Sequence, residues 1–306
     1  MQRTSTGFTE QDVPDQTGRT FVITGANTGL GYEAARVLAA NNARVIIACR
    51  SSEKARDARQ RILALHPGAD VQTLQLDLAS LASVHEAAAR LLEQEPRLDV
   101  LINNAGIMIP PYQLTEDGFE SQFGVNHLGP FAFTGLLLDT LRATPGARIV
   151  NTSSIAHKRG KIYFDDINAE RGYNAMLRYA QSKLANLYFT YELQRRLAAA
   201  DDATLSVAAH PGIASTELMR YTPKPLALLA PVFFPLFNSA AQGAWPTLAA
   251  ATDEQVRSGD YYGPGKRRET AGPAVPVKST RRSRDPDVAR RLWDLSIEMT
   301  GVDPGL

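Results

Sequence analysis

The sequence predicts a doubly wound α/β domain, in which a mostly parallel sheet carries helices on both faces. Apolar strand segments alternate repeatedly with helical segments between residues 19 and 210. The strand segments are apolar on both faces, as expected for a parallel sheet that helices cover on each side. Right-handed crossovers then give a Rossmann-like sheet, and ligands of such sheets bind outside the carboxyl ends of the strands.

The predicted elements follow one another in a regular order. The first helix begins after a Gly-rich turn, and the second ends before His66, because Pro67 and Gly68 cannot continue it. The predicted strands are 19–24, 43–49, 70–77, 98–104, 147–153 and 204–210. The predicted helices are 30–41, 52–65, 81–94, 115–142, 174–200 and, after a stretch of weaker alternation that begins at Ala214, 286–300.

Length and composition indicate one globular domain. The chain has 306 residues, 44% of them hydrophobic and 21% charged, which excludes a wholly disordered chain. We expect a single domain over 1–306, with its core at 18–265, an apolar segment at 217–238 and a C-terminal extension at 266–306 that packs on it. Lys and Arg (33) balance Asp and Glu (32), so no nucleic-acid surface is expected. Acidic residues and prolines interrupt the basic stretch 266–291.

Cysteine and histidine usage argues against metal and disulfide chemistry. Cys49 is the single cysteine, which excludes an internal disulfide, and we expect it to be a small buried residue. The histidines lack metal-ligand spacing, so no metal site is predicted. The start of the chain lacks the apolar core of a secretory signal, and the apolar run 225–237 is shorter than the roughly 20 residues of a membrane-spanning helix. A soluble cytoplasmic protein is expected.

The first strand ends in a turn that is typical of dinucleotide binding. Thr24-Gly25-Ala26-Asn27-Thr28-Gly29-Leu30-Gly31 joins the first strand to the first helix. A pyrophosphate that approaches backbone N–H groups at this helix start needs positions without a Cβ. A lone group of glycines would be a plain turn, but its place between strand and helix favours phosphate binding.

The next two strand ends carry charged residues that could face an adenosine. Arg50 stands where an acidic residue would bind the ribose 2′-hydroxyl of NAD, so it favours the 2′-phosphate of NADP, unless it is only a solvated turn residue. Asp77, followed by Leu78, can hydrogen-bond an adenine amino group or cap the following helix, and both interpretations stand equally.

The most informative pattern lies after the fourth and fifth strands. Small residues in 103–106 would let a ribose lie against the backbone, and Ser153 and Ser154 follow the fifth strand. Tyr179 and Lys183, four residues apart in a predicted helix, share one face. A nearby ammonium stabilises a phenolate and so lowers the pKa of a tyrosine from about 10 toward the neutral range. Alone the pair could be an exposed helix contact, but a phosphate-binding turn and a strand-end serine accompany it.

Together these motifs resemble the short-chain dehydrogenase/reductase family over about residues 18–265. The carriers are TGANTGLG (24–31), NNAG (103–106), Asn126, NTSS (151–154), YAQSK (179–183) and HPGIAST (210–216). More narrowly the chain resembles the retinol-dehydrogenase-like branch, through TGANTGLG, ACRS (48–51), FGVNHLGPF (123–131) and the segment around Leu292 and Trp293.

The resemblance implies a role for each matching position. The implied catalytic residues are Asn126, which would anchor a water in a proton relay, Ser154 rather than Ser153, Tyr179 and Lys183. Tyr179 and Lys183 also contact the cofactor, and the other implied cofactor-binding residues are Gly25, Asn27, Thr28, Gly29, Leu30, Gly31, Arg50, Asp77, Leu78, Asn104, Ala105, Gly106, Pro211, Gly212, Ile213 and Thr216. NADP(H) is favoured, and NAD(H) is the alternative.

The interval between Ser154 and Tyr179 is longer than in compact members of the family, so residues 156–176 are interpreted as an inserted loop. Tyr163 and Tyr173 lie in this loop without a lysine four residues on, which makes them weaker candidates. Asp165 and Asp166 are interpreted as solvated loop charges.

The expected reaction is hydride transfer between the nicotinamide and a carbonyl or carbinol carbon, with Tyr179 exchanging the proton. The resemblance implies that the apolar segment at about 217–238 is a substrate lid. The apolar side chains of 219–237 then suggest an apolar alcohol, aldehyde or ketone substrate, although the segment could equally pack on the core or form a homodimer or homotetramer interface. A peripheral membrane contact through this segment and the basic tail is a minor alternative. A second function on the same fold is a non-catalytic NADP(H)-binding sensor or regulatory protein.

Overall fold

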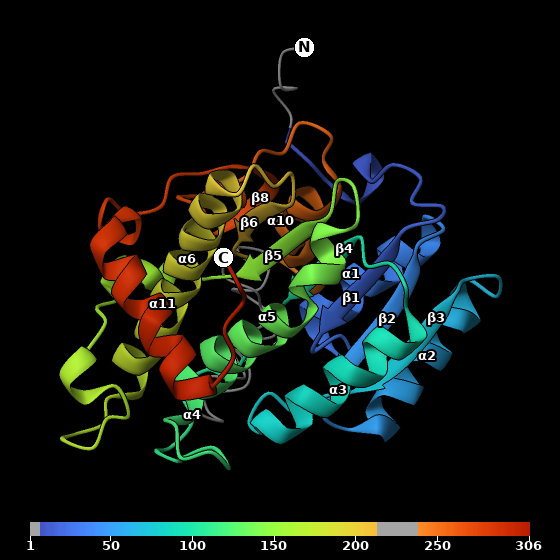
Figure 1. Cartoon of the computed structure of the whole chain (residues 1–306). Helices are drawn as coiled ribbons and strands as arrows, with labels where there is room; N and C mark the ends of the chain where they lie inside the picture. Colours follow the sequence, from blue (N-terminus) through green and yellow to red (C-terminus); the bar gives the residue numbers. More distant parts are fainter. Residues whose placement is uncertain (1–6, 213–237) are drawn as a thin grey trace, which may run out of the picture.

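The computed structural model describes residues 7–212 and 238–306, which form an eight-stranded sheet in the order β3-β2-β1-β4-β5-β6-β7-β8 (Figure 1). Strands β1 to β7 are parallel to their neighbours and β8 is antiparallel to β7. The strands are β1 (Thr20–Thr24), β2 (Arg44–Cys49), β3 (Val71–Gln75), β4 (Val100–Asn103), β5 (Arg148–Thr152), β6 (Leu205–Ala209), β7 (Tyr261–Lys266) and β8 (Ala271–Pro276). The doubly wound α/β prediction is confirmed.

Helices cover both faces of this sheet. They are α1 (Gly29–Ala40), α2 (Ser52–Leu65), α3 (Leu81–Gln94), α4 (Ser121–Phe123), α5 (Gly129–Arg142), α6 (Ala175–Ala199), α10 (Ala240–Thr252) and α11 (Pro286–Thr300). Single 3₁₀ turns lie at Glu10–Asp12, Ile155–Arg159, Phe164–Asp166 and Arg282–Arg284, and a π turn lies at Gly124–Leu128. Within 7–212 and 238–306, no helix combines the length and the apolarity that a bilayer crossing requires.

Alternate residues of β1 show how the two layers form. Phe21 and Ile23 pack into a core shared with α1, α2 and α10, whereas Val22 faces a second core shared with α3, α5, α6 and α11. All three side chains are fully buried. Because successive side chains of a strand point to opposite faces, this continuous apolar run needs helices on both sides.

Strand β3 departs from the prediction because it lies at the edge of the sheet. Val71 and Leu74 are buried, but Gln72 and Gln75, which lie on opposite faces, are exposed, so both faces of this strand are partly open to solvent. The expectation of strands apolar on both faces therefore holds for the central strands and is wrong for β3.

The long helix predicted over 115–142 is interrupted. Residues 115–120 form a turn, closed by a bridge between Leu114 and Glu120, with Gly118 at φ +82°. Glu120 then caps α4, because its carboxylate accepts hydrogen bonds from the N–H groups of Gln122 and Phe123, both at 2.9 Å. The π turn separates α4 from α5. A helical pattern alone does not reveal such a π turn, which often marks a functional position.

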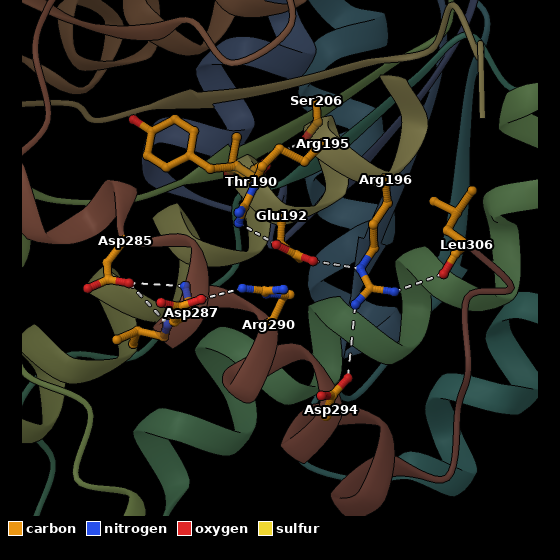
Figure 2. A network of polar contacts seen from close by, with 12 residues as sticks. Thr190, Glu192, Arg195, Arg196, Ser206, Asp285, Asp287, Arg290, Asp294 and Leu306 are labelled. Atoms are coloured by element: carbon orange, nitrogen blue, oxygen red, sulfur yellow. Dashed lines mark hydrogen bonds and ion pairs between the residues drawn. The ribbon is translucent and has the colours of Figure 1, made fainter. Parts of the chain in front are cut away.

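The C-terminal extension packs on α6, largely through α11 (Figure 2). The Arg196 guanidinium lies 4.5 Å from the ring centroid of Trp293, which is buried against Phe131 and Phe189. Arg196 also donates to Glu192 and to the Leu306 carbonyl, both at 2.8 Å. The predicted helix at 286–300 is confirmed, whereas α10 and the β7–β8 hairpin were not predicted.

Several cations of the basic stretch 266–291 have partners inside the fold. Arg282 donates to the Gly160 carbonyl at 2.6 Å. Arg284 lies over the ring of Tyr191 at 4.5 Å, and Arg291 lies over the ring of Phe164 at 4.0 Å. These cations therefore help to fix the extension to α6 and to the loop before it.

Candidate active site

The carboxyl ends of β4, β5 and β6 and the start of α1 border an open cleft of about 370 Å³. Among the described residues its lining is Leu30, Asn104, Gly106, Ile107, Met108, Thr152, Ser153, Tyr179, Lys183 and Pro211. The cleft thus brings together the first helix, the NNAG turn and the Tyr–Lys pair, which are far apart in sequence but were predicted to share one site.

The three glycines of the turn from β1 into α1 are needed for different structural reasons. A Cβ on Gly25 would lie 2.9 Å from the Cα of Ala105, and one on Gly31 would lie 2.5 Å from Nδ2 of Asn104. These two positions therefore allow close packing against the NNAG turn. Gly29 has φ +60°, and no atom lies within 4 Å of the place where a Cβ would stand, so its need is conformational and the space before α1 stays open.

Hydrogen bonds from Thr24 fix the NNAG turn against the end of β1. The Thr24 hydroxyl oxygen accepts from the N–H groups of Asn104 and Ala105, at 3.0 and 2.9 Å. The Asn104 amide donates to the Thr24 carbonyl at 2.8 Å. Asn27 and Thr28 complete the neighbouring turn, where the Asn27 carbonyl accepts from Arg61 at 3.0 Å and Thr28 precedes α1.

Arg50 and Asp77 meet at the ends of β2 and β3. The Arg50 side chain is 79% exposed, with Nε 3.9 Å from Oδ2 of Asp77. Asp77 accepts from the Ala79 N–H at 3.0 Å, while Ser80 caps α3. The capping alternative for Asp77 is therefore wrong. Leu78 is buried, and its carbonyl would lie 2.6 Å from a Cβ on Gly129.

Tyr179 and Lys183 lie on one face of α6, as their spacing predicted, and both are at least 95% buried. The Lys183 ammonium lies 5.8 Å from the Tyr179 ring centroid and donates to the Thr152 carbonyl at 3.2 Å. The Asn186 amide donates to the same carbonyl at 3.0 Å. The end of β5 therefore holds the lysine side chain beside the tyrosine.

Asn126 sits in the π turn and joins three segments. Its amide oxygen accepts from the Ile107 N–H at 2.8 Å, and its amide nitrogen donates to the Ile107 carbonyl and the Ser182 hydroxyl, both at 2.9 Å. A Cβ on Gly106 would lie 3.2 Å from Oδ1 of Asn126 and 3.3 Å from Nζ of Lys183. Asn126 and Lys183 thus converge on the NNAG turn.

The adjacent serines use their hydroxyls differently. Ser153 is buried and donates to the Lys183 carbonyl at 2.8 Å. Ser154 is half-buried and accepts from the Ala156 N–H at 3.2 Å, which caps the 3₁₀ turn Ile155–Arg159. Because Ser154 acts there as an acceptor, that contact leaves its own proton available for a further bond.

The loop between the serines and α6 contains two 3₁₀ turns and several fixed side chains. The Tyr173 hydroxyl donates to the Pro110 carbonyl at 2.8 Å, and the Arg178 guanidinium lies 4.8 Å from the Tyr163 ring centroid. Asp165 is exposed as expected, but Asp166 pairs with the buried Arg178 at 2.5 Å. The interpretation of Asp166 as a solvated charge is therefore wrong: it compensates a buried cation.

Of the segment predicted to contact the nicotinamide, Pro211 and Gly212 are described. Both are buried, and Gly212 has φ +77°, where a Cβ would lie 2.6 Å from the Thr270 carbonyl oxygen. Ile213, Thr216 and the apolar segment 217–237 lie outside the described residues.

Comparisons with known proteins identify the family of this chain. The family model for short chain dehydrogenase matches residues 19–226. Human retinol dehydrogenase 13 is 44% identical over 298 residues, which cover 94% of this chain and 86% of that protein. Mouse retinol dehydrogenase 12 is 44% identical over 287 residues, with 93% and 87% covered.

Solved structures show the same fold. A crystal structure of an uncharacterised Mycobacterium paratuberculosis protein has a TM-score of 0.81 and 42% identity, covering 98% of this chain and all of that one. The Pseudomonas aeruginosa RhlG/NADP complex has a TM-score of 0.64 and 25% identity, with 81% and 94% covered.

The chain belongs to the short-chain dehydrogenase family and is similar to its retinol dehydrogenases. It is therefore an NAD(P)-dependent oxidoreductase that acts on alcohol or carbonyl groups of a small-molecule substrate.

Proposed function

We propose that this family member is an NADP-dependent oxidoreductase that interconverts an apolar alcohol and its aldehyde or ketone, using Ser154, Tyr179 and Lys183. The observation that carries the proposal is the buried Tyr179–Lys183 pair, which lines one cleft together with Asn104 and Gly106 of the NNAG turn. A sensor that only binds a dinucleotide has no need for a buried phenol and ammonium at this place.

The residues around the cleft fit a dinucleotide. The open space beside Gly29, at the N-terminus of α1, suits a pyrophosphate because helix N–H groups point there. We assign the phosphates to Gly25, Asn27, Thr28, Gly29, Leu30 and Gly31, and the adenosine to Asp77, Leu78 and the NNAG turn. Pro211, Gly212, Ile213 and Thr216 are assigned to the carboxamide by the family resemblance. Bound NADP(H) would supply or remove the hydride.

The preference for NADP(H) over NAD(H) rests on Arg50. Its guanidinium is 79% exposed at the end of β2, where dinucleotide-binding sheets of this type bind the adenosine ribose, and this exposure supports contact with a 2′-phosphate. Oδ2 of Asp77 lies 3.9 Å from Nε of Arg50.

Side chains of the protein would transfer the proton and stabilise the reacting oxygen. Tyr179 donates a proton to the reacting oxygen in reduction and accepts one in oxidation. The Lys183 ammonium beside it favours the phenolate. Ser154 donates a hydrogen bond to the same oxygen, where negative charge develops. Asn126 would anchor the proton relay that runs through Lys183.

The names of the most similar relatives point to a retinoid as one member of the substrate class. We therefore propose apolar aldehydes such as retinal, long-chain aldehydes and their alcohols as substrates. The cytoplasmic location stays a prediction.

NADPH oxidation with a panel of retinal, long-chain aldehydes and aromatic and steroid ketones tests this proposal. Turnover is expected with at least one apolar carbonyl, and faster with NADPH than with NADH. Tyr179→Phe should lower kcat/KM by about 10³-fold, since proton transfer contributes ~10²–10⁴. Tyr163→Phe, in the neighbouring loop, should stay near wild type. Tight NADPH binding without turnover would favour the sensor.

A further inference from the structure

The turn between β7 and β8 has an unusual backbone. Three consecutive residues other than glycine, Arg267, Arg268 and Glu269, have left-handed φ values of 51°, 55° and 66°. Such conformations are costly for residues with a Cβ and persist only where surrounding contacts hold them. The side chain of the last of the three, Glu269, contacts two other segments of the protein.

The Glu269 carboxylate joins two segments that border the active site. Its Oε2 accepts from Nζ of Lys158 at 3.0 Å and lies 3.4 Å from Nε2 of His210. His210 and Lys158 hold the pKa of Glu269 at about 2, against the opposing effect of its partial burial, so the carboxylate is charged at neutral pH. Lys158 belongs to the 3₁₀ turn after the serines, and His210 directly follows β6.

The hydrogen bonds of His210 show which ring nitrogen carries the proton. The Gly212 N–H donates to Nδ1 of His210 at 3.2 Å, so Nδ1 is an acceptor and the proton of the neutral ring is on Nε2. Oε2 of Glu269 lies 3.4 Å from Nε2 without forming a hydrogen bond, so the contact between the two groups is electrostatic. The ring is 99% buried, and a Cβ on Gly263 would lie 2.1 Å from Nε2, so β7 confines it closely.

The 3₁₀ turn that contains Lys158 directly follows Ser154. His157 is in the same 3₁₀ turn as Lys158, and its Nδ1 lies 2.7 Å from the Ser154 carbonyl, to which it donates. A shift of Lys158 would therefore move the same 3₁₀ turn that is bonded to the backbone of Ser154. On the other side, Gly212 packs against the Thr270 carbonyl of the same β7–β8 turn.

We propose that Glu269 is a positioning residue, which sets the serine turn and the 210–212 segment relative to each other through Lys158 and His210. The inference rests on the proposed function, because it assigns Glu269 to the placing of Ser154 and of the segment assigned to the nicotinamide. Loss of its charge would leave the buried His210 N–H without its carboxylate and would release Lys158. A displacement of about 1 Å in either segment costs more in turnover than in cofactor binding.

The test compares Glu269→Gln, Lys158→Met and the double variant with wild type, and uses the exposed Glu298→Gln as a matched control. Single-turnover hydride transfer is measured at saturating NADPH and substrate, NADPH Kd by fluorescence, and the primary isotope effect with NADPH deuterated at the transferred position. Glu269→Gln should slow hydride transfer about 10–100-fold, leave the NADPH Kd within about threefold, and raise the isotope effect on kcat because chemistry becomes slower.

The double variant distinguishes a positioning role of Glu269 from a general loss of structure. Since Lys158 acts through Glu269, the double variant should lose little more than Glu269→Gln alone. Lys158 is partly exposed, so its variant should fold even if Glu269→Gln does not. Hydride transfer within twofold of wild type in Glu269→Gln, or fully additive losses, would overturn the inference. Absence of turnover in the wild-type chain would overturn the proposed function and the inference with it. The variant results, by contrast, would overturn the inference alone.

Discussion

Two sides of the cleft are stabilised by different kinds of contact. The glycine-rich side consists of residues 25–31 and the turn 103–106, where backbone segments touch and Thr24 supplies the main hydrogen bonds. The polar side consists of β5, α6, the end of β6 and the β7–β8 turn. There the buried Lys183 and Asn186 side chains donate to the Thr152 carbonyl, and the buried His210 ring lies 3.4 Å from the Glu269 carboxylate. The glycine-rich side therefore depends on close packing of backbone segments, and the polar side depends on hydrogen bonds and charges of buried side chains.

This difference implies that the two sides respond to different substitutions. A single added methyl group should disturb the glycine-rich side, because backbone atoms have no rotamer with which to move away. The polar side should tolerate changes of size better than the loss of a charge or of a hydrogen-bond partner, since its groups are buried.

The largest effect is expected on the polar side, from Lys183→Met. The variant keeps most of the side-chain volume but removes the ammonium beside Tyr179, so kcat/KM should fall by about 10³-fold or more. Steady-state kinetics measure this, with Lys161→Met as the exposed control. If Lys183→Met keeps wild-type turnover, the polar side does not depend on its charge.

Arg50→Asp tests a charge at the end of β2, the strand whose Ala48 carbonyl accepts from the Gly25 N–H of the glycine-rich side. A charge-assisted hydrogen bond contributes roughly 1.5–3 kcal/mol, so NADPH affinity should fall about 10–100-fold while NADH affinity changes little. Isothermal titration with both dinucleotides measures the difference. Stability should not change, because the side chain is 79% exposed, and Arg56→Asp is the matched control. Equal losses for NADPH and NADH would show that Arg50 does not read the 2′-phosphate.

Gly31→Ala tests the steric character of the glycine-rich side. Its Cβ would lie 2.5 Å from the Asn104 amide and 2.8 Å from the Gly25 carbonyl oxygen. We expect the free energy of unfolding to fall by about 1–3 kcal/mol from overpacking, partly offset by the higher helix propensity of alanine. Urea unfolding measures this. Gly68→Ala, with nothing within 4 Å of its Cβ position, should stay within about 0.5 kcal/mol. Equal stabilities of the two variants would contradict the account.

A pH dependence of stability is also expected from buried histidines near the polar side. Burial lowers the pKa of His157 from 6.5 to about 4 and also lowers that of His210. In the unfolded chain these histidines therefore become protonated near pH 6.5, whereas in the folded chain they become protonated only at lower pH. The contribution of His157 is present above pH 6.5 and is lost as pH falls toward 4, by up to about 1.4 kcal/mol per pH unit, and His210 acts in the same direction.

Urea unfolding between pH 7.5 and 5 measures this slope. His157→Gln should have a shallower slope than wild type, because one of the neutral buried rings is gone. His85→Gln, an exposed position, should keep the wild-type slope. A wild-type slope in His157→Gln would mean that this ring titrates alike in both states.

The regular part of the fold was predictable because its signals are local. The buried runs of β1, β2 and β4 to β6 have no polar interruption long enough to hide them, and α2 ends where Pro67 and Gly68 require it. By contrast, α10 contains Gly243 and Pro246, and β7 contains Gly263, Pro264 and Gly265, so neither shows an uninterrupted pattern. Their formation depends on packing against α1 and β6, which sequence periodicity does not report.

The site was predictable where one helix carries it and less so where the tertiary fold does. Tyr179 and Lys183 could be paired from a four-residue spacing alone. Ser182 and Asn186, on the same helix, matter only because Asn126 and Thr152 lie opposite them. Glu269 meets Lys158 from 111 positions away, and no local signal except the polar turn around it marks that contact.

The central claim is that a phenol steadied by a neighbouring ammonium exchanges the proton beside the redox ring. A crystal structure with NADP⁺ and a bound alcohol or unreactive analogue tests it most directly. We predict the Tyr179 hydroxyl and the Ser154 hydroxyl within about 3 Å of the ligand oxygen, and the Lys183 ammonium at the same distance from a ribose hydroxyl. A dinucleotide bound away from this cleft, or a Tyr179 hydroxyl turned from the ligand, would contradict the account.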